Sequence, residues 1–376
     1  MDNRRPTWAE IDLKAIKNNL RGIKDMAFGT KVMVAVKADA YGHGMLEVVR
    51  VCIQEGIDYL GVATLDEALL IRRAGIKVPI LVLGYVPDEY ARIMVEKDIA
   101  ATVFSIQLAR RLSIAAVELS KNASVHIKIE TGMGRLGLFP DNKTLDIISE
   151  ISTLPGIYLE GIFTHFAVAD IKDKTFTLEQ TELFKNFIIS LEERDIIIPL
   201  KHCANSAAIM EVPEAHFNMV RAGIVIYGLY PSDEVDKNRL MITPAMTLKS
   251  RISFIKDLDA GATISYGRTY RCSRKTRVAT VPIGYADGYT RLLSNRAHAV
   301  IKGHKVPLIG TICMDQCMVD ISEVKDAAIG DEVILFGKPE DGVTADDLAR
   351  SLGTISYEIV CSVGSRVPRI YKQVSS

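Results

Sequence analysis

Between about residues 30 and 230, short runs of β-branched and other apolar residues alternate with longer stretches whose apolar residues recur at helical spacing. The short runs are bounded by turn residues and are typical of strands buried in a parallel sheet. The expected strands cover residues 31–37, 59–63, 79–83, 100–104, 124–130 and 158–165, with two more near 201–203 and 219–225. The helical stretches include 65–75, closed by Gly75, and 177–195, with Thr177 as the expected N-cap. This alternation predicts an α/β fold, whether a closed (β/α)₈ barrel or an open doubly wound sheet.

The pattern changes near residue 236. Closely spaced strand candidates follow at residues 245–256, 276–284, 298–310 and 331–337, separated by glycine and aspartate turns, and one helix is expected at 344–353. A chain of 376 residues usually exceeds one hydrophobic core. We therefore expect a first domain at 1–235 and a mainly β domain at 236–376, with about the first 12 residues able to join either one.

Charge and composition exclude several classes of partner. Lys and Arg together number 46, as do Asp and Glu, so no net field attracts nucleic acid or an anionic membrane. The N-terminus lacks the apolar segment of a signal peptide and no apolar run approaches membrane-spanning length, so we expect a cytoplasmic protein with a small-molecule substrate. The six cysteines are scattered without metal-type pairs, so free, mostly buried thiols and no metal site are expected.

Lys37 ends the first expected strand, where the strand gives way to a glycine-bearing loop. Strand alternation places it on one face with Met33 and Ala35, and barrel enzymes carry their chemistry at this end of their strands. A lysine that emerges from an apolar strand is partly desolvated, which lowers its pKa and favours the neutral amine that attacks an aldehyde. For this segment alone, a strand-end lysine that reaches solvent is the alternative.

The segment AVKADAYGHG, residues 35–44, resembles the cofactor-lysine signature of the alanine racemase family. Further segments resemble blocks of that family in the same order: KIETGMGRLG, THFAVAD, HCANSAA, VRAGIVIYGLYP, SYGRTY, VPIGYADGY, VPLIGTICMDQ and TISYEIVCSVGSRVPR. The resemblance covers nearly the whole chain. It implies a (β/α)₈ TIM-type barrel followed by a mainly β domain, with pyridoxal 5'-phosphate held as a Schiff base on Lys37. It also implies racemisation of L-alanine and D-alanine, which would supply D-alanine for cell-wall precursors.

The resemblance assigns residues to the phosphate of this cofactor. Ser206 and the backbone of Gly223 and Ile224 would bind the phosphate, with the hydroxyls of Tyr41 and Tyr357 as further donors. Taken alone, Ser206 is equally compatible with a helix N-cap.

By the same resemblance, Arg221 would face the pyridine nitrogen and keep it unprotonated. A neutral ring is a poorer electron sink, which suppresses side transamination. His202 would brace Arg221, although an interior histidine with satisfied hydrogen bonds is an equally good interpretation. The family commonly has proline where this chain has Ala222, which predicts a slightly looser turn and no lost donor.

Racemisation removes a proton from one face of the α carbon and returns one to the other, so two acid–base groups are the simplest solution. The resemblance makes Lys37 one of them and Tyr266 the other, with His165 polarising the phenol and Arg221 behind it. In the family the two groups meet across the interface of a homodimer, so each site is composite. The residues assigned to the same contribution from the partner subunit are Met314, Asp315 and Tyr285.

The expected strand 124–130 alternates His126, Lys128 and Glu130 with apolar residues, so its polar row should point into the barrel. A register error of one residue is the alternative. By resemblance, Arg135 contacts the substrate carboxylate and a cofactor oxygen. Lys128 occupies a position that is often carbamylated, which would make it an anion able to orient Arg135.

Three other functions share parts of this pattern. A non-catalytic pyridoxal-phosphate-binding protein on the same barrel would lack the second domain. A racemase for serine or for several amino acids would share every cofactor contact; the bulky Tyr285 and Tyr357 favour alanine, yet one methylene in an apolar pocket discriminates by only about 1–3 kcal/mol. A decarboxylase of related fold would carry a cysteine motif that is not recognisable here.

Overall fold

The sheet at the centre of the first half contains eight parallel strands in the order β8-β7-β6-β5-β4-β3-β2-β9. The structure is a computed structural model that describes residues 5–372. The strands are β2 (Lys31–Ala35), β3 (Tyr59–Val62), β4 (Ile80–Val82), β5 (Ala100–Val103), β6 (Ala123–Lys128), β7 (Ile157–Phe163), β8 (Leu200–His202) and β9 (Met219–Ala222). The strands at the two ends of this order are joined, because the Arg221 N–H donates to the Ala204 carbonyl at 3.0 Å. The sheet therefore closes into a barrel, and the open-sheet alternative is wrong.

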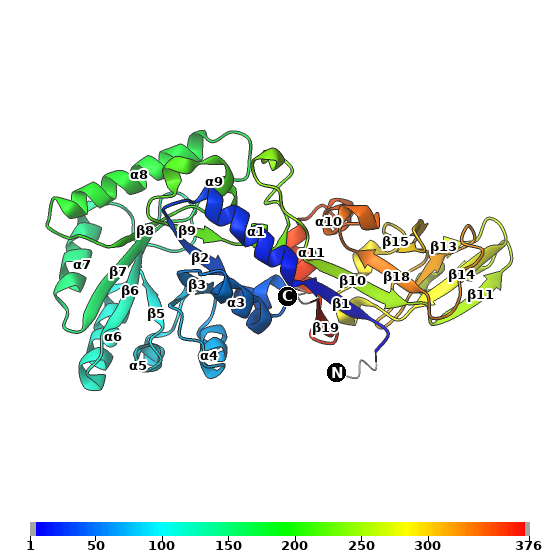
Figure 1. The fold of residues 1–376 in the computed structure, drawn as a ribbon, viewed down its shortest axis with the longest axis horizontal. Coiled ribbons are helices and arrows are strands. Elements are labelled where there is room, and N and C mark those ends of the chain that lie inside the picture. Colours follow the sequence, from blue (N-terminus) through cyan, green and yellow to red (C-terminus); the bar gives the residue numbers. More distant parts are fainter. Residues whose placement is uncertain (1–4, 373–376) are drawn as a thin grey trace.

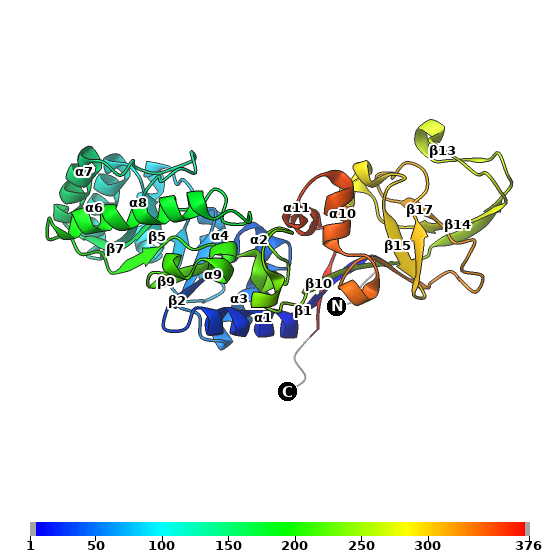
Figure 2. The ribbon, with the colours of Figure 1, turned by 90° about the horizontal axis from the view of Figure 1, so that it is seen from above.

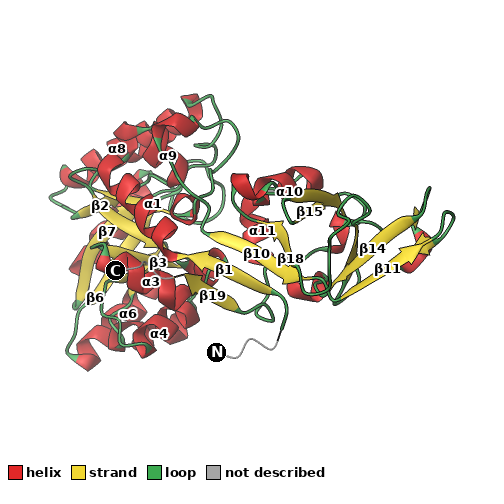
Figure 3. Ribbon diagram, turned by 45° about the vertical axis from the view of Figure 1, so that its right-hand side comes forward, coloured by secondary structure: helices red, strands yellow, loops and turns green. Residues whose placement is uncertain are grey.

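Helices cover the outside of the barrel (Figures 1 and 3). They are α1 (Leu13–Met26), α3 (Met45–Gln54), α4 (Leu65–Arg73), α5 (Ala91–Glu96), α6 (Ile106–Leu119), α7 (Asn142–Thr153), α8 (Thr175–Glu192) and α9 (Ser206–Glu211). The prediction of Thr177 as N-cap is wrong, because α8 begins at Thr175, whose N–H donates to the Asp173 carboxylate at 2.9 Å. Periodicity shows that a helix exists better than it shows where the helix begins.

One end of the barrel interior is packed with apolar side chains. A buried cluster inside the barrel comprises Met33, Tyr59, Leu81, Ala100, Phe163, Leu200 and Met219. Four of these, Tyr59, Ala100, Leu200 and Met219, are the first residues of their strands. The amino ends of the strands are therefore closed by packing, which leaves the carboxyl ends for a site.

The second part of the chain is mainly β and lies beside the barrel (Figures 1 and 2). Its largest sheet has the strand order β16-β15-β18-β10-β1-β19, and smaller sheets have the orders β11-β14-β17 and β12-β13. The strands are β1 (Trp8–Asp12), β10 (Met246–Arg251), β11 (Phe254–Leu258), β12 (Thr263–Ile264), β13 (Tyr270–Arg271), β14 (Thr276–Val281), β15 (His298–Ile301), β16 (His304–Pro307), β17 (Cys317–Asp320), β18 (Glu332–Phe336) and β19 (Arg369–Lys372). β1 pairs with β10 and β19, so the start of the described chain belongs to this sheet and not to the barrel.

Two helices stand between the barrel and the smaller sheets, α10 (Ala345–Leu352) and α11 (Ser356–Ser362) (Figure 2). The sequence predicts α10 but not α11, because a helix of 7 residues is too short for its periodicity to show. A Cβ atom on Gly42 would collide with the Val360 carbonyl, so α11 packs directly against the barrel mouth. This contact brings Tyr357 to the barrel.

Within residues 5–372, no helix is both long and apolar enough to cross a bilayer. All six cysteines are free thiols, as predicted, and most are buried: Cys52, Cys203, Cys272 and Cys317 are buried, Cys313 is half-buried and Cys361 is exposed.

Candidate active site

A cavity of about 610 Å³ lies at the carboxyl ends of the barrel strands. Strand-end residues in its wall include Ala35, Ala63, Leu83, Lys128, Phe163 and Arg221. The cationic side chains that line it are Lys37, Lys128, Arg135 and Arg221, and the lining carboxylate is Asp170. This excess of positive charge suits an anionic ligand.

β2 ends at Ala35, so Lys37 lies just beyond the strand, after Val36, and lines the cavity half-buried. Burial lowers the pKa of its amine, and the charges of Arg135 and Arg221 lower it further. The neutral, nucleophilic amine is therefore present at lower pH than for an ordinary lysine.

The backbone forms a left-handed turn immediately after Lys37. Residues 38–41 all have φ between 53° and 55°, a conformation that costs an L-residue about 1–2 kcal/mol. The turn is held by its neighbours, because its first N–H donates to the Glu67 carboxylate at 2.7 Å and Nδ1 of His43 lies 2.9 Å from the Tyr41 carbonyl. Backbone strain of this kind gathers at functional sites, where the surrounding structure over-determines it.

Tyr41, Ser206 and Gly223 converge on one end of the cavity. A Cβ atom at Gly223 would lie 3.1 Å from the Tyr41 hydroxyl and 3.4 Å from the Ser206 hydroxyl, so glycine leaves this space open. The Gly223 N–H donates to the Ser206 hydroxyl at 3.0 Å. The N-cap interpretation of Ser206 is wrong, because the cap of α9 is Asn205, whose side chain accepts from the Ala208 N–H at 3.1 Å.

Arg221 is buried at the end of β9, with 6% of its surface exposed. Its terminal nitrogens donate to the carbonyls of Thr164, His202 and Cys203 at 2.8 Å, 2.9 Å and 3.0 Å. They also lie 3.0 Å from Nδ1 of His202 and 3.0 Å from Nδ1 of His165. Because a guanidinium only donates, both Nδ1 atoms accept, and each neutral ring carries its proton on Nε2.

Burial determines the charges of Arg221, His165 and His202. Burial, aided by the charge of Arg221, holds the pKa values of His165 and His202 well below the usual value. Burial also lowers the pKa of Arg221 to about 10, which leaves it cationic at neutral pH. The site therefore contains one fixed cation flanked by two neutral imidazoles.

The polar row of β6 faces the barrel interior, as predicted. Nδ1 of His126 lies 2.9 Å from Nε2 of His202, and Lys128 lines the cavity. Glu130, just beyond the strand, instead accepts hydrogen bonds from three backbone N–H groups of residues 132–135 and shapes that loop. The loop carries Arg135 to the cavity wall.

Ala222 ends β9 and pairs with Val34 of β2, so the ladder continues to that point. Tyr227, which the sequence does not single out, is fully buried and donates to the Ala35 carbonyl at 2.9 Å. Its ring centre lies 4.9 Å from that of Tyr41. Tyr227 lies within a family-like block, yet no spacing rule in the sequence indicates which strand it contacts.

Four predicted site residues do not line the cavity of their own chain. These residues, which we call the exposed loop group, are Tyr266, Tyr285, Met314 and Asp315. The first three are 69%, 43% and 52% exposed. Tyr266 precedes β13, which lies on the side of the second part away from the barrel (Figure 2).

The loops that carry this group are bonded to one another. The Thr311 hydroxyl donates to the Tyr266 carbonyl at 2.8 Å. The Tyr285 N–H donates to the Cys313 carbonyl at 3.1 Å, and the Ala286 N–H donates to the Met314 carbonyl at 3.0 Å. The exposed loop group is therefore a single connected unit on the surface of one chain.

A closed barrel with a lysine amine in a cation-lined cavity at the carboxyl ends of its strands has the arrangement of a barrel enzyme, with a cavity whose charge suits an anionic ligand. Residues 11–231 match the family model described as alanine racemase, N-terminal domain, and residues 245–371 match alanine racemase, C-terminal domain. An alanine racemase of Clostridium perfringens is 48% identical over 371 residues, which cover 98% of this chain and 96% of that protein. An alanine racemase of Methanococcus maripaludis is 48% identical over 368 residues, or 97% of this chain and 98% of that protein.

Among solved structures, an alanine racemase of Clostridium difficile 630 superposes with a TM-score of 0.95 at 46% identity, covering 99% of this chain and 97% of that chain. The chain belongs to the alanine racemase family and is an isomerase.

Proposed function

We propose that the chain interconverts L-alanine and D-alanine with pyridoxal 5'-phosphate bound in the cavity, using Lys37 and Tyr266 as its two acid–base groups. The observation that carries this proposal is the content of the cavity. A half-buried lysine amine shares it with two hydroxyls converging over Gly223 and with the buried cation of Arg221.

The donor set at the Gly223 end fits a phosphate. The hydroxyls of Tyr41 and Ser206 would bind it with the backbone of Gly223 and Ile224, in space that a side chain at position 223 would fill. Tyr357 lines the same cavity, with its ring centre 6.1 Å from that of Tyr41. When bound, pyridoxal phosphate withdraws electrons from the α carbon of an amino acid and so acidifies the α proton.

Arg221 would hold the other end of the cofactor. Protein acceptors engage its terminal nitrogens, which within residues 5–372 leaves the Nε–H for a ring nitrogen. A cation that only donates keeps that nitrogen an unprotonated acceptor. An unprotonated ring withdraws electrons more weakly than a protonated one. This favours return of the proton to the α carbon over side transamination.

Arg135 would bind the substrate carboxylate, because its planar guanidinium matches that group. Lys37 would move the proton on one face of the α carbon, since burial leaves its amine neutral more readily. Neutral His165 carries its proton on Nε2 and can donate to the oxygen of Tyr266, which stabilises the ionised phenol.

We infer that Tyr266 reaches this site from a partner subunit. The exposed loop group does not line its own cavity, and its large apolar side chains are solvent-exposed in one chain. A homodimer with composite sites would bury them and would add Tyr285, Met314 and Asp315 to the pocket of the other chain.

Lys128 is proposed to be carbamylated. Its amine lies among cations, and burial, with the charge of Arg221, lowers its pKa to about 7. The neutral nitrogen would attack CO₂, form an N–C bond and lose a proton, so that an anion replaces a cation beside Arg135. That anion would orient Arg135 by charge-assisted hydrogen bonding.

The remaining assignments rest on the family resemblance. We propose a barrel domain at 1–235 and a β domain at 236–376, with β1 as the segment that crosses to the β domain. We also propose that the enzyme acts in the cytoplasm and supplies D-alanine for cell-wall precursors.

A strain that lacks the gene should then require added D-alanine for growth, and growth without it would contradict this role.

Borohydride reduction followed by peptide mapping should find the cofactor attached to Lys37. Replacing Lys37 by alanine should lower the rate of D-alanine formation from L-alanine by roughly 10²- to 10⁴-fold or more, because a general base contributes about that much. Lys77→Ala, an exposed lysine outside the cavity, is the matched control and should keep full activity. A label on another residue of fully loaded protein would overturn the assignment.

Mixing Lys37→Ala with Tyr266→Ala subunits should restore activity that neither variant shows alone. Random exchange makes half of the dimers hybrid, and each hybrid has one intact site, so about a quarter of the wild-type rate is expected. Persistent inactivity after demonstrated subunit exchange would rule out shared sites.

In ¹³C-bicarbonate, NMR should show one carbamate signal that Lys128→Gln removes. Because the pKa of the free amine is about 7, the neutral fraction, and with it the carbamate, should increase as pH rises through 7 and decline below it. An unmodified amine at pH 8, shown by intact mass and NMR, would contradict the proposal.

A further inference from the structure

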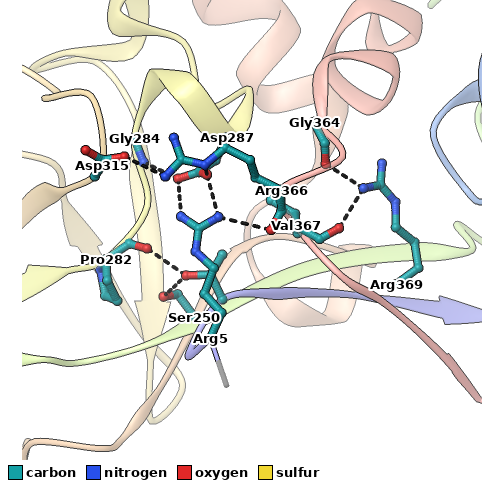
Figure 4. Close-up of polar contacts among 11 residues, drawn as sticks. Arg5, Ser250, Pro282, Gly284, Asp287, Asp315, Gly364, Arg366, Val367 and Arg369 are labelled. Carbon is teal, nitrogen blue, oxygen red and sulfur yellow. Dashed lines mark hydrogen bonds and ion pairs between the residues drawn. The ribbon is translucent and has the colours of Figure 1, made fainter. Parts of the chain in front are cut away.

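Asp287 is the most deeply buried acid near the exposed loop group, with 1% of its surface exposed. It closes the turn that carries Tyr285, residues Tyr285–Asp287, because its carboxylate accepts from the Gly284 N–H at 3.0 Å. Arg5 pairs with both carboxylate oxygens, at 2.6 Å to Oδ1 and 2.6 Å to Oδ2. Arg366 lies on the same carboxylate, with its Nε 3.5 Å from Oδ1 (Figure 4).

Arg366 extends this group to Asp315. Its NH2 lies 2.7 Å from Oδ1 of Asp315. One guanidinium therefore bridges the buried Asp287 and an exposed member of the loop group (Figure 4). Together, the contacts of Arg5, Asp287, Asp315 and Arg366 join four parts of the chain: the N-terminal segment, the turn around Tyr285, the loop of Met314 and Asp315, and the segment that follows α11.

The backbone shows how tightly the two loops approach at this point. A Cβ atom on Gly284 would collide with the carbonyls of Cys313 and Met314, so the Tyr285 turn lies directly on the Met314 loop. A displacement of Asp287 would therefore move Tyr285 and Met314 together.

The same segment also has a connection toward the chain's own cavity. Arg369 donates to the carbonyl of Gly42, which follows the Lys37 turn, at 3.0 Å. It also donates to the carbonyls of Val363 and Gly364 at 2.6 Å each. The side-chain contacts of Asp287 and Arg366, in contrast, lead to the exposed loop group.

We propose that Asp287 and Arg366 are positioning residues for a pocket that they do not line: by fixing Tyr285, Met314 and Asp315, they shape the substrate pocket of the partner subunit. This inference rests on the composite site proposed above. The buried carboxylate of Asp287 keeps its geometry because Arg5 and Arg366 both pair with it and the Gly284 N–H binds one of its oxygens, so moving it away would leave a buried charge less well compensated. The exposed loops thus have a rigid base before the second subunit binds.

The first test uses Asp287→Asn and Arg366→Gln in the purified, cofactor-loaded enzyme. Both should load cofactor on Lys37 with an unchanged absorbance spectrum. The KM for alanine should rise and kcat/KM should fall by roughly 10- to 100-fold, the loss expected from misplacing a binding group by about 1 Å. Arg366→Lys should remain impaired, because a lysine ammonium cannot bridge two carboxylates with the same geometry.

Hydrogen exchange supplies a readout that does not depend on activity. The amides of Tyr285 and Ala286, which donate to the Met314 loop, should exchange faster in both variants. Arg274→Gln is the matched control. Arg274 is about as exposed as Arg366 and, within residues 5–372, its ion pairs are with Asp320 and Glu323 and not with a member of the exposed loop group. It should leave the KM and the exchange rates unchanged.

Hybrid dimers decide which pocket the two residues serve. In a hybrid of Asp287→Asn with Lys37→Ala, the one pocket that retains Lys37 receives its partner loops from the chain with intact Asp287. That hybrid should therefore show the wild-type KM. In a hybrid of Asp287→Asn with Tyr266→Ala, neither pocket receives its partner loops from a chain in which Asp287 and Tyr266 are both intact. The KM of this hybrid should therefore stay raised.

A raised KM in the first hybrid would overturn the proposal, since Asp287 would then act on its own chain's cavity. If Asp287→Asn is insoluble, Arg366→Gln, which changes a half-exposed residue, takes its place in the hybrids with Lys37→Ala and with Tyr266→Ala. Failure of Lys37→Ala and Tyr266→Ala to complement would reject the composite site itself, so the two failures are distinguishable.

Discussion

The buried guanidinium of Arg221 joins the carboxyl ends of three barrel strands. It lies near the end of β9 and donates to carbonyls at or just beyond the ends of β7 and β8. This is the place where β8 and β9, the two outermost strands of the sheet order, meet. Its position fixes the protonation state of His165 and His202, because a group that only donates makes both rings accept. The same residue thus helps to close the barrel through its backbone N–H and sets the electrostatics of the site through its side chain.

The buried positive charge of Arg221 is unfavourable unless a negative charge nearby compensates it. The cavity contains three further cationic side chains and one carboxylate, and burial lowers the pKa values of Lys37 and Lys128 in response. The simplest resolution is an anionic ligand, and the hydroxyls over Gly223 supply donors for one. On this view the cofactor phosphate, the substrate carboxylate and a carbamate on Lys128 would each neutralise a cation that the fold already holds.

Apart from Ile355 and Tyr357, which line the cavity of their own chain, the second part of the chain serves a different purpose. Its sheets do not extend the cavity of the same chain but hold a connected set of loops at the surface, with aromatic and methionine side chains exposed. The ion pairs of Asp287 with Arg5 and Arg366 lie beneath these loops, where the proposed pocket shared between subunits would need support. If a loop that completes the partner's site became ordered only when the subunits associate, this ordering would weaken the affinity between the subunits.

The sequence by itself determined the order and kind of most elements. The eight barrel strands, the polar row of His126 and Lys128, and the run of short strands after residue 236 follow from periodicities that report which face of an element is buried. The family-like segments indicated Lys37 and the chemistry around it. Periodicity did not reveal α11 or the start of α8, because a short helix or a single turn spans too few residues to show a repeat.

Only the tertiary structure decided which distant residues meet. The placement of Tyr227 against the Lys37 strand, the left-handed turn at 38–41 and the burial of Asp287 between Arg5 and Arg366 depend on strand order and chain closure. Contacts across hundreds of residues leave no local pattern, because each partner has the composition of an ordinary turn or strand end until the fold brings the two together.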